Sequence, residues 1–171
     1  MSPPHLTHTF TLRVQAGPSS SSLHFPPSQP NPTRHITPVI GGFLHGIPGT
    51  RAAGLTATLL PGGSDWVLRD DTKNILHLDV RTQARTSSGQ GVYIQYTGHL
   101  VLDEATERFM RRDEGAGSTA FGGHEWWITP HFEIGDPEYE WVQRGVFFGR
   151  GRFHLEGEFR GVEYEIFEVR N

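Results

Sequence analysis

Five side chains that can move protons or bind anions occur within one short stretch of the sequence. His77, Asp79, Arg81 and Arg85 alternate with apolar residues, so they share one face of a predicted β-strand, and Tyr93 follows on the next strand. Asp79 and Arg81 are two residues apart, and we expect an ion pair that leaves the guanidinium with donors for an oxyanion. The imidazole, carboxylate or phenol would carry a proton while the two guanidinium groups stabilise an enolate or phenolate. These residue types predict acid–base chemistry that needs no cofactor.

The element that positions these side chains is a β-hairpin over residues 77–98, with its turn at Gly89. The opposite face of both arms is aliphatic. The polar face is either exposed to solvent, with weak surface ion pairs, or directed into a cavity. We expect it to line a cavity, although the aliphatic face could equally fill a core.

Aromatic residues elsewhere supply flat apolar surfaces for a hydrophobic ligand. The predicted substrate-binding residues are Trp66, Gln95, Tyr96, Trp127 and Trp141. Each tryptophan could instead belong to an ordinary core. We expect Asp65, within the sequence PGGSDW, to cap a turn.

Composition excludes several classes of protein. The 171 residues fit one domain, and the net charge of −4 without a basic block argues against a nucleic-acid surface. The absence of cysteine excludes disulfides, cysteine-ligated zinc and thiol catalysis. Neither a G-x-S-x-G elbow nor a phosphate-binding glycine loop is present, so hydrolase chemistry is unsupported.

Ten histidines invite a metal hypothesis, but their spacing matches no metal motif. His124 is followed by Glu125 without the second histidine of a zincin helix, and His131 falls within a predicted strand. A metal site assembled from residues on separate strands remains an alternative. We expect neither a metal nor a cofactor.

The sequence indicates a soluble, cytoplasmic protein. The N-terminal residues lack the charged and apolar regions of a signal peptide, and no apolar run approaches the roughly 18 residues of a membrane span. Homo-oligomerisation stays open.

The predicted fold is all-β. We expect eight or nine short strands with one helix at residues 103–112, which favours one antiparallel β-barrel domain over residues 1–171. Residues 16–38 are rich in serine and proline and predict a flexible loop, and residues 103–123 form an inserted helix and loop. Outside the hairpin, candidate strand segments lie at residues 8–15, 35–44, 52–60, 66–69, 126–134, 142–149, 152–155 and 162–169.

Several separated motifs resemble the family called domain of unknown function 3237, or UPF0311. They are ITPVIGG at 36–42, LPGGSDW at 60–66, LDVR at 78–81 with VYIQYTG at 92–98, and TPHFEIGDPEYEW at 129–141 followed by VFFGRGR. The resemblance implies a lipocalin-like or avidin-like barrel and, through fungal relatives, cofactor-free isomerisation or cyclisation in secondary metabolism, including chalcone-isomerase-like ring closure. Ser87-Ser88-Gly89 stands where the family usually has Asp-Asp-Gly, so any role of those acids is lost here.

Three functional hypotheses follow. The first is a cofactor-free isomerase or cyclase acting on a hydrophobic, oxygenated small molecule of polyketide or flavonoid type. The second is a non-catalytic barrel that binds a similar ligand. The third is a structural module whose barrel is filled by its own side chains.

Overall fold

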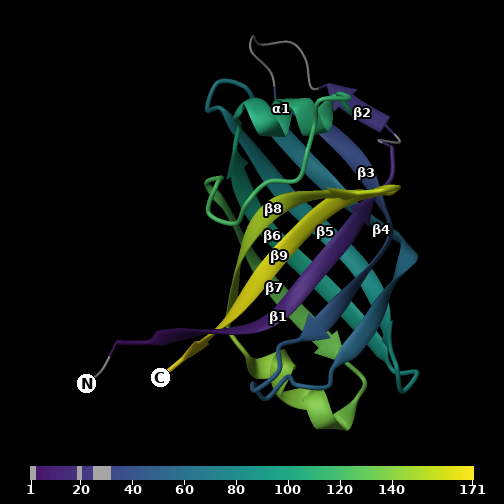
Figure 1. Ribbon diagram of the computed structural model, residues 1–171, viewed down its shortest axis with the longest axis vertical. Helices are drawn as coiled ribbons and strands as arrows, with labels where there is room; N and C mark the ends of the chain where they lie inside the picture. The colour runs from purple at the N-terminus through teal and green to yellow at the C-terminus, as the bar shows by residue number, and fades with distance from the viewer. Residues whose placement is uncertain (1–2, 19–20, 25–31) are drawn as a thin grey trace.

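The structure, a computed structural model, describes residues 3–18, 21–24 and 32–171, with the side chains of 21–24 left undescribed. Eight antiparallel strands close into a barrel (Figure 1), because β1 pairs with both β9 and β3 at the seam. The short strand β2 adds to the outer edge of β3. The strands are β1 (His5–Ala16), β2 (Ser21–His24), β3 (Thr33–Gly46), β4 (Thr56–Asp70), β5 (Ile75–Thr86), β6 (Gly91–Val101), β7 (Trp126–Ile134), β8 (Phe147–Glu156) and β9 (Phe159–Arg170). The predicted antiparallel barrel is confirmed.

Strand alternation decides what fills the barrel. In β5 the even-numbered residues from Leu76 to Thr86 are buried, whereas the odd-numbered residues are exposed or half-buried. β7 alternates in the same way over its whole length. Because successive side chains of a strand point to opposite faces, the apolar set forms the core inside the barrel and the polar set forms its outer wall.

Two short helices lie at opposite ends of the barrel (Figure 1). α1 (Glu104–Met110) lies across one end, and the 3-10 helix η1 (Pro137–Arg144) lies across the other. At the η1 end, Phe10 packs against Phe132, Trp141 and Phe147 with ring centroids 5.5–6.0 Å apart. This end of the lumen is therefore filled by aromatic side chains.

Most of the predicted elements are found, with three corrections. β2 and the start of β3 lie in the stretch predicted as a loop, whose residues 19–20 and 25–31 are outside the described part of the chain. The strands predicted at 52–60 and 66–69 are one strand, β4, with an irregularity between them. The strand predicted at 142–149 is wrong in its first part, because Asp136 caps η1 and Pro137 starts it. β8 begins only at Phe147 and continues to Glu156, so it includes the strand predicted separately at 152–155.

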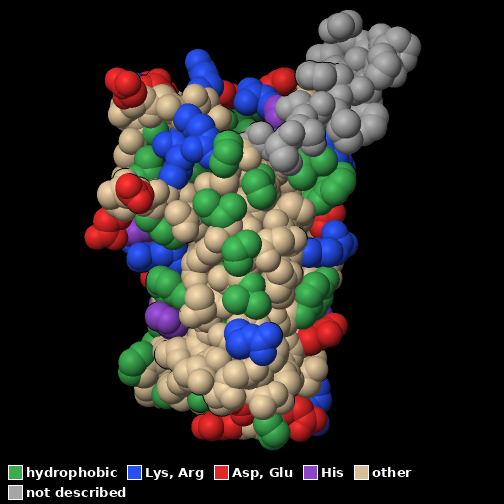
Figure 2. Space-filling view, turned by 90° about the vertical axis from the view of Figure 1, so that its right-hand side faces the viewer, with side chains coloured by type: hydrophobic (Ala, Val, Ile, Leu, Met, Phe, Trp, Pro, Cys, Tyr) green, Lys and Arg blue, Asp and Glu red, His purple; other side chains and the backbone are tan. Residues whose placement is uncertain are grey.

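The outer surface carries charges of both signs. On the side shown in Figure 2, acidic and basic side chains both occur, with hydrophobic side chains among polar and backbone atoms. Large exposed hydrophobic residues include Leu6, Trp66, Trp127 and Phe148. Among the described residues, no helix is long and apolar enough to cross a membrane.

Candidate functional site

The polar face of β5 lies on the outer wall, so the expectation that it lines a cavity is wrong. His77, Arg81 and Arg85 are exposed and Asp79 is half-buried, whereas Val80 between them is buried. Burial of the aliphatic face removes more apolar surface from water, and the polar face stays solvated. The expected ion pair does form, with the Arg81 Nη1 to Asp79 Oδ1 distance at 3.0 Å, but it is a surface pair.

The other predicted residues are distributed over both sides of the wall. Trp66 and Trp127 are exposed by 41% and 46%, and Gln95 is half-buried on the outer face. Trp141 belongs to the aromatic cluster at the η1 end. Tyr96 alone of the predicted substrate-binding residues lies in the hollow part of the lumen.

Two predicted residues meet on the outside. Arg85 and Tyr93 line an open hollow on the outer wall, together with Gln83, Glu133 and Gln143. The Arg85 guanidinium donates to the Gly89 carbonyl at 2.8 Å, which holds it at the β5–β6 turn. His77, Asp79 and Arg81 do not line this hollow, so it does not bring the predicted catalytic residues together.

A cavity occupies the half of the barrel below α1. It is partly open to solvent, and most of its lining side chains are aliphatic or aromatic. Among the described residues that line it, Asp65 is the only carboxylate, and the hydroxyl-bearing residues Tyr96 and Tyr164 line the same space. An apolar pocket with a few convergent polar groups is the usual form of a small-molecule site.

Asp65 reaches the lumen through an irregularity in β4. Leu60 pairs with Gln83 and Ser64 with Arg81, so β4 advances four residues where β5 advances two. Because the two extra residues preserve the period of two, the next lumen-facing position after the irregularity is Asp65, opposite the lumen-facing Val80. Asp65 therefore lies in a strand and is not the turn cap that we expected.

Burial dominates the chemistry of the Asp65 carboxyl. Loss of hydration and the nearby Asp79 charge raise its pKa to about 7, against the lowering effects of a backbone N–H and Arg34. The backbone N–H of Asp79 donates to Asp65 Oδ1 at 3.3 Å. Asp65 is half-buried because part of its surface faces the cavity that it lines. A carboxyl with this pKa can both accept and release a proton at neutral pH.

Three buried hydrogen-bond donors accompany this carboxyl. The rings of Tyr96 and Tyr164 are 5.3 Å apart, and the Trp126 ring meets Tyr164 edge-on at 5.5 Å. Burial raises the pKa of both tyrosines, and the Asp65 charge raises each further, so both hydroxyls stay protonated at neutral pH. The Trp126 indole N–H is near enough to influence the Tyr164 pKa, but it reaches hydrogen-bond geometry with no described atom. An unpaired buried donor in a cavity is suited to a ligand oxygen.

Hydrogen bonds of Asp103 and His124 hold α1 over this end of the cavity. Asp103 caps the helix by accepting from the Thr106 backbone N–H at 2.8 Å. Its other carboxylate oxygen is 2.5 Å from His124 Nδ1, and His124 Nε2 is 2.9 Å from the Thr119 hydroxyl. Burial works to raise the pKa of Asp103, but the hydrogen bonds from Thr106 and His124 lower it on balance.

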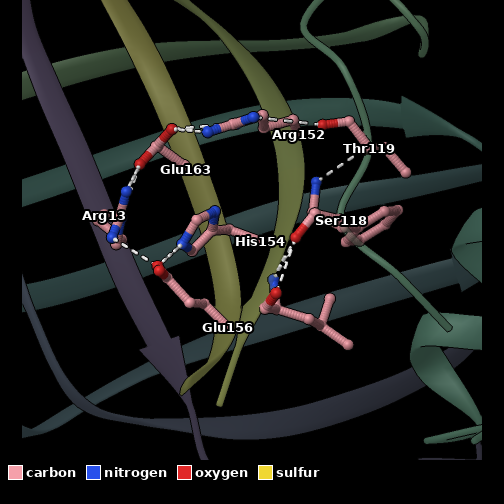
Figure 3. A network of polar contacts seen from close by, with 9 residues as sticks. Arg13, Ser118, Thr119, Arg152, His154, Glu156 and Glu163 are labelled. Carbon is pink, nitrogen blue, oxygen red and sulfur yellow. Dashed lines mark hydrogen bonds and ion pairs between the residues drawn. The ribbon is translucent and has the colours of Figure 1, made fainter. Parts of the chain in front are cut away.

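The segment after α1 is also fixed to the outer wall (Figure 3). Glu163 of β9 accepts from Arg13 of β1 and Arg152 of β8, and Arg152 also donates to the Thr119 carbonyl. Ser118 hydrogen-bonds to the backbone of β8. Burial acts to raise the pKa of Glu163, but the two guanidinium groups hold it below its usual range. The covering of the cavity is thus tied to three strands of the barrel.

Within residues 3–18, 21–24 and 32–171, no three histidine or acidic side chains come together in an arrangement that could hold a metal ion. The acid–base residues of the cavity differ from the predicted set. Asp65, Tyr164 and Trp126 come from β4, β9 and β7, and only the barrel closure brings them together.

Comparisons with known proteins agree with this architecture. A UPF0311 protein of Rhodopseudomonas palustris is 23% identical over 150 residues, which are 87% of this chain and 88% of that protein. Its crystal structure, that of a conserved protein of unknown function, superimposes with a TM-score of 0.76 and 20% identity over 99% of this chain and 100% of that chain.

Two further solved structures share the fold. A protein of Acinetobacter baumannii described as beta-barrel like matches with a TM-score of 0.68 and 20% identity over 99% of this chain and 98% of that chain. A protein of Penicillium herquei described as an enzyme matches with a TM-score of 0.60 and 14% identity over 99% and 97% of the two chains. The sequence model of the DUF3237 proteins, described as proteins of unknown function, matches residues 4–169, and the chain belongs to that family.

Proposed function

We propose that the protein is a cofactor-free isomerase or cyclase that binds a hydrophobic, oxygenated small molecule in the barrel cavity. The observation that carries this proposal is the single carboxyl, Asp65, in an apolar cavity beside buried hydroxyl and indole donors. Proton transfer together with stabilisation of an oxyanion is sufficient for an intramolecular conjugate addition. The description of the Penicillium herquei neighbour as an enzyme is consistent with catalysis on this fold.

Each group has a distinct role in the proposed reaction. The Asp65 carboxylate takes the proton of a ligand hydroxyl, and the oxygen formed attacks the β-carbon of an enone in the same molecule. The enone carbonyl then becomes an enolate, whose oxygen accepts hydrogen bonds from Trp126 and from the hydroxyl of Tyr96 or Tyr164. Asp65 returns the proton to the α-carbon, which leaves no net change in protons.

The experiment uses 2′-hydroxychalcone, whose ring closure gives a flavanone. Closure in buffer gives both enantiomers equally, so chiral chromatography separates enzymatic from spontaneous product. We expect an excess of one enantiomer with the wild type and a loss of about 100-fold or more in rate with Asp65→Asn. The matched control is Asp71→Asn, which removes an exposed carboxylate paired with Arg69 and should keep the activity.

Two results would contradict the proposal. One is a racemic product from the wild-type protein at the buffer rate. The other is a loss of turnover in Arg81→Ala with Asp65→Asn unaffected, which would assign the chemistry to the outer wall.

A second function, non-catalytic binding, is supported by the predominantly apolar lining of the cavity. In that case Asp65→Asn would preserve or improve the affinity for neutral ligands, because a neutral amide replaces a buried carboxyl. Saturable ligand binding without stereoselective closure would favour this alternative.

A further inference from the structure

A second, smaller hollow adjoins the cavity beside the C-terminal end of α1. Four of its lining residues also line the main cavity: Ala16, Thr37, Phe109 and Met110. The two hollows are therefore neighbours that share part of their walls. The apolar hollow lies inside the barrel, and the smaller one, which we call the mouth, lies beside the end of α1.

Two arginines, Arg112 and Arg160, line the mouth. The Arg160 guanidinium lies 4.5 Å from the centre of the Phe109 ring and donates to the Phe109 carbonyl. Burial and the neighbouring positive charge of Arg112 lower the pKa of Arg160. Two positive charges thus line the same small hollow, beside a cavity that is largely apolar.

Neither charge is neutralised by the described part of the protein. Arg160 and Arg112 form no ion pair there, although other arginines near α1 do: Arg108 with Glu104 at 2.6 Å and Arg69 with Glu107 at 2.5 Å. Arg160 is half-buried and Arg112 is exposed. Like charges that line one hollow repel each other unless an anion is present, and guanidinium groups bind carboxylates well. The arrangement is complementary to a negatively charged group placed between the two side chains.

We infer that Arg112 and Arg160 bind an anionic group, such as a carboxylate, of a ligand whose hydrophobic body fills the barrel cavity. This inference rests on the proposed function insofar as it takes that cavity as the binding site. It narrows the ligand class from hydrophobic, oxygenated molecules to those that carry an acid at one end. It also orients the ligand, with the anion at the mouth and the remainder directed towards Asp65.

The test compares two probes of the same shape, 2-naphthoate and its neutral amide 2-naphthamide, in binding titrations at pH 7.5 with the full chain. We expect 2-naphthoate to bind the wild type at least about tenfold more tightly, because its carboxylate pairs with two guanidinium groups. Arg112→Gln and Arg160→Gln should each remove most of this preference while leaving the affinity for 2-naphthamide within about twofold.

The two probes separate anion binding from a structural role. Arg160 also contacts α1, so a variant that merely loosens the helix would weaken both probes equally. Arg144→Gln is the matched control, because it removes an exposed arginine of η1 at the opposite end of the barrel and changes the net charge by the same amount. It should preserve the preference.

The outcomes distinguish this inference from the proposed function. Equal affinity of the wild type for the two probes, or an equal loss of preference in Arg144→Gln, would overturn the inference and leave the cavity as a binding site. Absence of saturable binding by either probe would overturn both. Asp65→Asn should retain the charge preference, whether or not it affects turnover.

Discussion

Asp65 has an environment that favours the neutral acid over the carboxylate. The Asp79 backbone N–H donates a long hydrogen bond to the Asp65 carboxyl, and its neighbours in the cavity are largely apolar. Tyr96 and Tyr164 keep their protons because of the same burial. At the residue scale the site is therefore one titratable acid among groups that stay protonated and can donate, which is the division of roles that acid–base catalysis needs.

The raised pKa of Asp65 makes stability depend on pH. The folded protein holds the proton more tightly than the unfolded chain, so folding stability is highest below the usual pKa and falls as the pH rises to about 7. We expect the free energy of unfolding of Asp65→Asn to exceed that of the wild type by about 1–3 kcal/mol at pH 8–9. This difference is smaller than the full pKa shift implies, because water in the cavity screens the charge. Urea unfolding at several pH values measures this difference.

The difference should shrink as the pH falls towards 4, where the folded protein holds the carboxyl protonated and the unfolded chain is about half protonated. Asp71→Asn, at an exposed position, should show no such gain at high pH. A stability difference between Asp65→Asn and the wild type that is constant from pH 4 to pH 9 would refute the raised pKa.

The functional residues were only partly predictable from the sequence. Tyr96 was identified because it belongs to the aromatic residues of a strongly alternating strand. Asp65 was assigned to a turn, because Pro-Gly-Gly-Ser-Asp has the composition of a turn and the continuation of β4 through it depends on pairing with distant strands. Tyr164 lies in β9, and no local pattern indicates that it meets Tyr96.

At the element scale, the irregularity in β4 positions the carboxyl. A Cβ at Gly63 would lie 2.6 Å from the Arg81 carbonyl oxygen and 2.7 Å from the Thr82 side chain, so only glycine allows the close approach of β5. We expect Gly63→Ala to destabilise the protein by about 1–3 kcal/mol through overpacking. Thermal unfolding measures this effect.

Gly91→Ala is the matched control. A Cβ at Gly91 would meet nothing within 4 Å, so the stability should change by less than about 0.5 kcal/mol. Equal effects of the two substitutions would show that the tight approach at Gly63 does not hold the local register.

The periodicity of β5 predicts which residues share a face, but it does not predict which face points into the barrel. Alternation correctly separated an aliphatic set from a polar set. Which set faces inward depends on closure of the sheet, and closure buries the aliphatic set because eight strands enclose a small apolar lumen. The polar residues of β5, which the sequence predicted to be catalytic, therefore lie on the solvated outer wall.

At the scale of the whole molecule, the two ends of the barrel differ. Below α1 the lumen is hollow, whereas at the η1 end it is filled and tied together by Arg51. This arginine lies 3.7 Å from the centre of the Trp141 ring and pairs with Glu168 of β9, whose side chain is 5% exposed. The loop between β3 and β4, the helix η1 and the last strand are thereby joined across one end.

Removal of the buried charge should weaken this closed end. Glu168→Gln leaves Arg51 without its anion, and we expect a loss of about 1–3 kcal/mol in the free energy of unfolding. Glu158→Gln, at an exposed position with no ion pair among the described residues, should have little effect. Because the cavity lies at the other end, the folded Glu168→Gln variant should bind 2-naphthamide as the wild type does; a folded variant that fails to bind would contradict the separation of the two ends.

The barrel class followed from the strand pattern and the resemblance, since many short alternating strands need closure to remove their edges. The difference between the two ends of the barrel did not follow from the sequence. The helix η1 occupies a stretch that was partly predicted as a strand, and the aromatic cluster joins residues far apart in the chain. The Arg112 and Arg160 pair likewise depends on the three-dimensional meeting of α1 with the β8–β9 hairpin.

The central claim is that the barrel cavity contains a carboxyl poised to exchange protons at neutral pH. It is tested most directly by a carbon-13 NMR titration of the Asp65 carboxyl, assigned by comparison with Asp65→Asn. A midpoint at about pH 7 is the predicted result. A midpoint near pH 4, the value of a solvated aspartate, would contradict the account.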